Sequence, residues 1–306
     1  MRPSWVAASV RARLVATHGV GRERVLEIAR CASLADATTA LASTAYGDAV
    51  RAGADLAEAQ RAVAATALWQ MRVLAGWLPP GAALHARVLV AWFEIANLDE
   101  RLAELDGMPS RRPFDPGSLG SASRRIAGAS STSDLRLALA ASDWGDPGSD
   151  EPADIARAVR LRWARRVLDA VPAAAPWALG AVALLLARDL AAGGRPRGAL
   201  FRLPELGRGV ADAADITGLT RRLSPRASWV LAGIDDAGAL WTAEVRWWRR
   251  VEEDARALLV RSSDGMSVLT GAAALVAVDA RRVSAALAAA ARGGSASALE
   301  VLDAVA

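Results

Sequence analysis

The chain has 306 residues, 53% of them hydrophobic, and a formal net charge of +4 at neutral pH. Its basic side chains are arginines spread along the sequence, which excludes the concentrated basic stripe of a typical nucleic-acid-binding protein. One cysteine and two histidines exclude an internal disulfide and a zinc cluster. We therefore expect no nucleic-acid partner, no metal and no cofactor.

The apolar segments are expected to lie inside a folded protein rather than in a membrane. Segment 178–192 is shorter than the roughly 20 uninterrupted apolar residues that a bilayer requires, and segment 268–291 is interrupted by Asp279 and Arg281. Arg11 and Arg13 interrupt the apolar run that a signal peptide would need. These features predict a cytoplasmic protein.

The first part of the chain predicts a series of helices. Short amphipathic helices are expected at 5–18 and 24–30, and a long helix at 55–77. Between them lies the segment 33–48, which ends in Tyr46. Its pattern returns later in the chain, and we call it the signature.

Residues 88–105 form the best-bounded predicted helix. Gly107 and Pro109 stop it. Glu94 and Asn97 lie close to its apolar stripe, and we interpret them as a satisfied polar pair between helical bundles, for which an arginine is a candidate partner. The stripe itself follows from apolar residues at steps of three and four, namely Val88, Trp92, Ile95, Leu98, Leu102 and Leu105.

The same plan is repeated along the chain. Further stripe helices are predicted at 179–190 and 275–287, and each is followed by a glycine stop, Gly193 and Gly293. The signature returns at 133–146, where Trp144 aligns with Tyr46, and less clearly at 216–229. Long helices are expected at 154–170 and 238–260, and no segment alternates as a strand would. The sequence therefore predicts an all-α fold of three similar helical units in series, at 1–109, 110–200 and 201–306.

Three segments, taken in order, resemble a known family. They are the arginine-containing opening 10–13, the signature from Leu41 to Tyr46, and the helical segment 92–98. Together they resemble the C subunit of prokaryotic V-type (A-type) ATPases, called subunit d in eukaryotes, over nearly all of the chain. Two departures are the missing glutamates around Asp279 in the third stripe helix and the absence of lysine.

The resemblance implies a funnel of three bundles around a pseudo-threefold axis. In that family the subunit sits on the membrane proteolipid ring and receives the foot of the central stalk. The expected function is a non-catalytic rotor adaptor, peripheral to the cytoplasmic face of the cell membrane and monomeric in isolation. It would transmit torque between ATP synthesis or hydrolysis and the transport of protons or sodium.

Two other classes of function are considered. One is an all-α repeat scaffold that binds unrelated proteins, which would have no affinity for any rotary subunit. The other is an α-helical enzyme, which would need acids or bases gathered around a pocket. The sequence offers no such cluster, so we expect no active site.

Several residues are candidates for contacts with partner subunits. Trp247 and Trp248 point about 100° apart on a helix, so one of them is a candidate exposed anchor. Guanidinium groups suit an acidic stalk, because they bind carboxylates in a two-pronged manner. The candidate arginine pairs are Arg111 with Arg112, Arg165 with Arg166, and Arg221 with Arg222.

Other conspicuous residues are expected to be structural. Asp235 and Asp236 are typical of a turn that leads to a helix N-cap. Segment 252–254 predicts a solvated acidic face paired with arginines one turn away. The glycine-rich segment 193–198 lacks the ending of a phosphate-binding loop and is expected to be a linker. Core packing is expected for the tryptophans that fall within helical stripes or at their entry, which are Trp92, Trp163, Trp177 and Trp241.

Overall fold

The computed structural model describes residues 5–79, 81–194 and 203–294. The fold is all-α, as predicted, with about 70% of the chain in helices. No strand occurs among the residues described, apart from one isolated antiparallel bridge between Gly207 and Leu223. The predicted boundary near residue 201 and segment 195–198 of the expected linker lie outside the described residues.

The chain forms two compact lobes. The N/C lobe comprises residues 1–82 and 248–306, and the middle lobe comprises residues 83–247. Helix α13, Leu240–Arg261, contributes its first third to the middle lobe and the remainder to the N/C lobe. The division into three helical units of similar plan remains a prediction.

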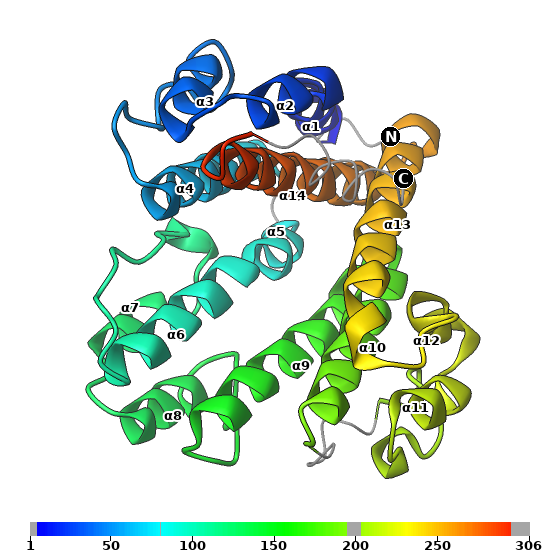
Figure 1. Cartoon of the computed structure of the whole chain (residues 1–306). Coiled ribbons are helices and arrows are strands. Elements are labelled where there is room, and N and C mark those ends of the chain that lie inside the picture. The colour runs from blue at the N-terminus through cyan, green and yellow to red at the C-terminus, as the bar shows by residue number, and fades with distance from the viewer. Residues whose placement is uncertain (1–4, 80, 195–202, 295–306) are drawn as a thin grey trace. The chain divides into compact units, whose positions relative to one another are not determined.

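The N/C lobe is organised around its last helix. Helix α14, Gly265–Ala290, begins at an N-cap, Asp264, whose side chain accepts hydrogen bonds from the backbone N–H groups of the first turn. The four N-terminal helices of the chain all pack against it (Figure 1). They are α1 (Val6–Thr17), α2 (Arg22–Ala29), α3 (Leu34–Leu41) and α4 (Leu56–Ala75).

The middle lobe follows the chain without interruption. Its first part shares one apolar core, in which Ile95, Leu98 and Leu102 of the predicted stripe are buried. Its second part packs around the apolar helix α10. Its helices are α5 (Ala83–Val90), α6 (Trp92–Leu105), α7 (Ser123–Gly128), α8 (Thr132–Ala140), α9 (Pro152–Ala170), α10 (Ala175–Ala191), α11 (Ile216–Arg222) and α12 (Pro225–Ser228).

The predicted helix 88–105 is divided at Ala91, between α5 and α6. Ala91 takes the buried position, so the stripe of α6 runs from Ala91 to Ile95 and onward. Trp92 is one position out of phase with this stripe and is 49% exposed, as is Trp241. The expectation of core packing is wrong for these two tryptophans, whereas it is confirmed for Trp177, which is buried.

All three stripe helices end in the same way. Gly107, Gly193 and Gly293 have positive φ values of 90°, 75° and 91°. Each donates its N–H to the carbonyl three residues earlier, and the following residue donates to the carbonyl five residues earlier. This double hydrogen bond is the Schellman stop, which requires a left-handed residue that glycine adopts without strain. The predicted glycine stops are confirmed.

One segment, Pro172–Ala191, is long and apolar enough to cross a membrane, so the expectation that no segment would qualify is wrong. The length criterion is met because the helical run begins before residue 178, at Pro172. However, 61% of its most apolar window is buried within the protein, as is usual for a core helix.

Candidate functional site

The best-defined polar site surrounds Glu94 on α6. The side chain is 2% exposed, and its carboxylate accepts six hydrogen bonds of 2.7–3.1 Å. Five come from backbone N–H groups and hydroxyls of residues 121–123 at the start of α7, and one comes from the Trp144 indole. The carboxylate thus fastens the beginning of α7 and the end of the signature to one point on α6.

The acidity of Glu94 reflects these donors. Burial by itself would raise the pKa of the carboxyl group, because it disfavours the charged form. The hydrogen bonds from Ala122, Ser123 and Ser121 outweigh burial, and the pKa is lowered from its usual value. Glu94 is therefore ionised at neutral pH, and hydrogen bonds from the protein take the place of water around its carboxylate.

Asn97 lies one turn from Glu94 and holds a different segment. Its Nδ2 donates to the Phe114 carbonyl at 2.9 Å, and its Oδ1 accepts from the Phe114 N–H at 2.7 Å. The rings of Phe114 and Phe93 also pack edge to face, with their centres 5.3 Å apart. Glu94 and Asn97 belong to the predicted first unit, whereas these hydrogen-bond partners belong to the predicted second unit. The donors to Glu94 are serines, backbone groups and an indole rather than an arginine.

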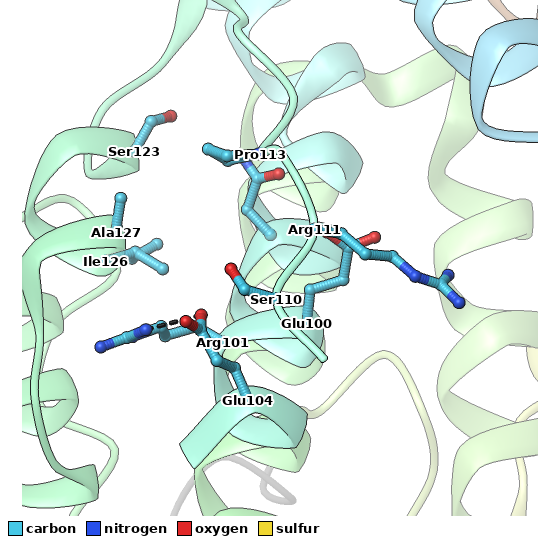
Figure 2. A pocket seen from close by; sticks show the side chains of 10 residues that line it. Glu100, Arg101, Glu104, Ser110, Arg111, Pro113, Ser123, Ile126 and Ala127 are labelled. Carbon is cyan, nitrogen blue, oxygen red and sulfur yellow. Dashed lines mark ion pairs between the residues drawn. The ribbon is translucent and has the colours of Figure 1, made fainter. Parts of the chain in front are cut away.

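A small cavity of about 140 Å³ lies beside this site. Figure 2 shows Arg101 paired with Glu104 on one wall and the Arg111 guanidinium extending away from that pair. Arg101 also donates to the Ala129 carbonyl, which anchors it at the end of α7. The remaining lining residues are Asn97, Glu100, Ser110, Pro113, Ser123, Ile126 and Ala127.

A matching joint occurs in the N/C lobe. Asp279 on α14 accepts a hydrogen bond from the Tyr46 hydroxyl at 2.8 Å and one from the Val20 N–H at 2.9 Å. Val20 lies just before α2, as Ser121 lies just before α7. Each signature helix that follows has a serine N-cap, Ser33 or Ser131, that accepts from the N–H of an aspartate.

The two signatures also end alike. Thr44 donates its hydroxyl to the Leu41 carbonyl and accepts from the Tyr46 N–H, and Ser142 makes the same two bonds with Leu139 and Trp144. The residues of the second set lie 98 positions after those of the first. The predicted alignment of Trp144 with Tyr46 is therefore reproduced hydrogen bond by hydrogen bond.

The third joint has no acid. Glu94 and Gly180 each lie 13 positions before a glycine stop, and Asp279 lies 14 positions before one. A Cβ atom on Gly180 would come within 2.9 Å of both the Trp229 and the Trp247 rings. Trp229 ends the third signature, so at this joint an aromatic ring packs on a glycine where the other joints have a hydrogen-bonded carboxylate. The sequence showed the stops but not these partners.

The predicted arginine pairs lie in different surroundings. Arg111 and Arg112 are exposed in the segment after α6, and Arg221 is exposed at the end of α11. Arg222 donates to the Gly218 carbonyl of its own helix. Arg165 pairs with Asp169 on α9. Arg166 lies 5.2 Å from the centre of the Trp144 ring and 4.0 Å from Asp143.

Trp247 and Trp248 are both half-buried. The Trp247 indole donates to the Trp177 carbonyl at 2.8 Å, and the Arg281 guanidinium lies over the Trp248 ring at 5.0 Å. Whether either contacts a partner stays a prediction. The helix-cap role of Asp236 is confirmed, because its carboxylate accepts from the Gly238 and Ala239 N–H groups.

The acidic segment 252–254 pairs with arginines as predicted, but the expectation of a solvated face is wrong for Glu252, which is 13% exposed. Glu253 and Asp254 bind Arg249 and Arg250 one turn earlier, and Glu252 binds Arg256 one turn later. Glu252 also receives Arg282 of α14, a contact between helices that the sequence did not indicate. Within the described ranges, no group of three or more histidine, cysteine or acidic side chains is placed to hold a metal ion.

The chain matches no model of a known protein family, and no curated protein sequence matches it.

Proposed function

We propose that this chain is a non-catalytic rotor adaptor of a V/A-type ATPase, joining the central stalk to the membrane proteolipid ring. The proposal starts from the family resemblance of the opening, the signature and the helical segment 92–98. The observation that carries it further is the repeated joint, in which a stripe helix fastens the aromatic end of a signature. A repeated framework of this kind suits a mechanical part.

The order of the joints supports a closed set of three units. The second signature is fastened by Glu94 of the first stripe helix, and the third packs on Gly180 of the second stripe helix. The first signature is fastened by Asp279 of the third stripe helix. The signature of each unit thus contacts the stripe helix of the preceding unit, and the signature of the first unit contacts the stripe helix of the last. Three bundles around a pseudo-threefold axis, in a funnel, would produce this cyclic order.

The proposed role also accounts for the chemistry of the joints. An adaptor that transmits torque between a stalk and a ring needs internal contacts that stay formed while force acts on it. A buried carboxylate with six donors is costly to break, because each donor would be left unsatisfied in the interior. In the proposal Glu94 and Asp279 therefore hold the adaptor's shape while the partners bind elsewhere on the surface.

The proposal is tested by binding of the purified chain to the central-stalk subunit pair from the same cell. Calorimetry at two salt concentrations should show saturable one-to-one binding that weakens with salt, because arginine contacts with acids are screened. Arg111→Glu and Arg221→Glu together should weaken binding further, since both side chains are exposed.

The matched control is Arg51→Glu, which makes the same change of charge at another exposed position. Equal weakening by the control would mean that only the overall charge matters and would remove these two arginines from the interface. Absence of binding by the folded wild-type chain would contradict the rotor adaptor and favour the all-α scaffold for unrelated proteins.

A further inference from the structure

Helix α1 is oriented with its larger apolar side chains outward. The face that packs into the lobe consists of small residues, Ala8, Ser9 and Ala12. Val6, Val10 and Leu14 face the other way and are 50%, 62% and 44% exposed. A surface helix normally buries its larger apolar residues, because their transfer from water is the more favourable. We therefore infer that the outward face of α1 is a contact surface.

The outward stripe is flanked by arginine on both sides. At about 100° per residue, Val6, Val10 and Leu14 fall within an arc of about 80°. On the same helical wheel Arg13 lies about 20° before this arc and Arg11 about 60° after it. The Arg11 guanidinium lies over the Trp77 ring at 5.2 Å, and Arg13 donates to the Leu259 and Ser262 carbonyls. These contacts hold both cations in place without neutralising their charge.

More apolar surface adjoins each of the two arginines. Trp77, under Arg11, is 50% exposed. Val260, next to the Leu259 carbonyl that Arg13 binds, is 84% exposed. We call the set of Val6, Val10, Leu14, Trp77 and Val260 the α1 surface. It combines an aliphatic stripe, a tryptophan at its edge and two fixed positive charges.

Few acidic side chains adjoin α1 among the residues described. No acidic residue precedes Glu23 in the sequence. Two acids approach the region. Asp279 on α14 is buried with Tyr46, whereas Asp264, the N-cap of α14, is exposed. A partner for the α1 surface should therefore be apolar at its centre and negatively charged around it.

We propose that the α1 surface docks directly on an anionic lipid surface. The exposed aliphatic stripe and Trp77 offer apolar side chains to a membrane interface, and the two arginines offer cations to its phosphates. The aliphatic side chains would enter the boundary between headgroups and acyl chains, and Arg11 and Arg13 would remain level with the lipid phosphates. This inference goes beyond the rotor adaptor and does not depend on it.

The test is co-flotation of the full chain with vesicles that contain no protein. With vesicles of phosphatidylcholine and phosphatidylglycerol the wild-type chain should float, and the bound fraction should fall as salt is raised. With phosphatidylcholine alone it should bind much less. Val10→Gln with Leu14→Gln should lower the partition coefficient on the order of 10-fold or more, because two aliphatic groups no longer enter the lipid.

Leu137→Gln is the matched control, since Leu137 on α8 is 66% exposed and lies in the other lobe. Circular dichroism and thermal melting establish that each variant is folded, as expected for substitutions at exposed sites. The proposal is overturned if the folded wild-type chain does not float with anionic vesicles, or if the double variant floats equally well. A concentration-dependent dimer that the double variant abolishes, without vesicle binding, would instead make this surface a contact between two copies. Stalk binding is measured separately, so either proposal can fail alone.

Discussion

Glu94 and Asp279 occupy the same position at two joints, but their pKa values are shifted in opposite directions. Six donors surround Glu94 and lower its pKa in spite of burial. For Asp279 burial is the largest influence, and the bonds from Tyr46, Val20 and Gly21 do not offset it, so the pKa is raised. Tyr46, buried beside Asp279, also has a raised pKa because burial and the nearby carboxylate both disfavour its anion. The larger number of hydrogen-bond donors around Glu94 therefore explains why its pKa is lowered while that of Asp279 is raised.

Replacing Glu94 tests the stronger joint. Glu94→Gln keeps the size of the side chain but turns an NH₂ group toward donors, so some N–H and hydroxyl groups lose their acceptor. We expect a loss of at least about 2 kcal/mol in the free energy of unfolding, measured by urea denaturation at neutral pH. Glu104→Gln on the same helix removes a charge that is 33% exposed and paired with Arg101, and it should cost much less. Equal effects of the two substitutions would contradict the structural importance of Glu94.

Replacing Asp279 tests the weaker joint through its pH dependence. Because the folded-state pKa lies above that of the unfolded chain, the folded state binds more protons between the two values, and stability from this group falls as pH rises through that window. Asp279→Asn does not titrate and keeps an oxygen for the Tyr46 hydroxyl. The stability advantage of the wild-type protein over Asp279→Asn should therefore be larger at about pH 4 than at neutral pH.

The measurement is the urea midpoint of both proteins at the two pH values. Glu94→Gln provides the contrast, since a lowered folded-state pKa means that the advantage of the wild-type protein is present at neutral pH and is lost in acid. A gap for Asp279→Asn that widens toward neutral pH would show that the pKa of Asp279 is lowered rather than raised.

At the scale of elements, the three stripe helices share their ends but differ at the joint. The Schellman stops place the joint residue at nearly the same height above each helix end. On α6 and α14 that residue is an acid that binds the start of a neighbouring helix. On α10 it is Gly180, which lets two tryptophan rings approach the backbone. One helical plan thus supports two kinds of joint, one hydrogen-bonded and one apolar.

Gly180 should resist substitution even by alanine. Alanine is favoured over glycine within a helix by about 1 kcal/mol. At Gly180, however, a Cβ atom would meet the rigid rings of Trp229 and Trp247 at 2.9 Å. We expect Gly180→Ala to destabilise the protein by about 1–3 kcal/mol through overpacking, measured by thermal and urea denaturation.

Gly128→Ala is the control for this substitution. Gly128 lies in α7, and a Cβ atom there would have no neighbour within 4 Å. This substitution should be neutral or slightly stabilising. A stabilising effect of Gly180→Ala would mean that the two rings do not pack against the helix backbone.

At the scale of the whole molecule, the sequence predicts the elements better than their partners. The all-α fold, the three glycine stops and the alignment of Tyr46 with Trp144 follow from local patterns, because helix periodicity and left-handed glycines act over a few residues. The acid that binds each aromatic residue lies 50 or 233 positions away, and local patterns carry no information on that pairing. Trp92 was misplaced because the break at Ala91 shifts the phase of the stripe.

The candidate interface residues illustrate the same division. The sequence identified arginine pairs by their repetition, but only the structure shows that Arg165 binds Asp169 and that Arg166 packs on Trp144. The outward stripe of α1 was predicted only as an amphipathic helix. Which face such a helix buries depends on the partner helix, here α14, whose close approach selects alanine and serine.

The composition of the N/C lobe has a consequence for the synthesis of the protein. The middle lobe is continuous in sequence, so it can fold as soon as residue 247 has left the ribosome. The first four helices are made earlier but pack against α14, which is made last, and Tyr46 must wait for Asp279. Although domains generally fold in order from the N-terminus, here the beginning of the chain is completed after the middle. Until then its apolar faces remain uncovered, and we expect the nascent chain to be most prone to aggregation in this period.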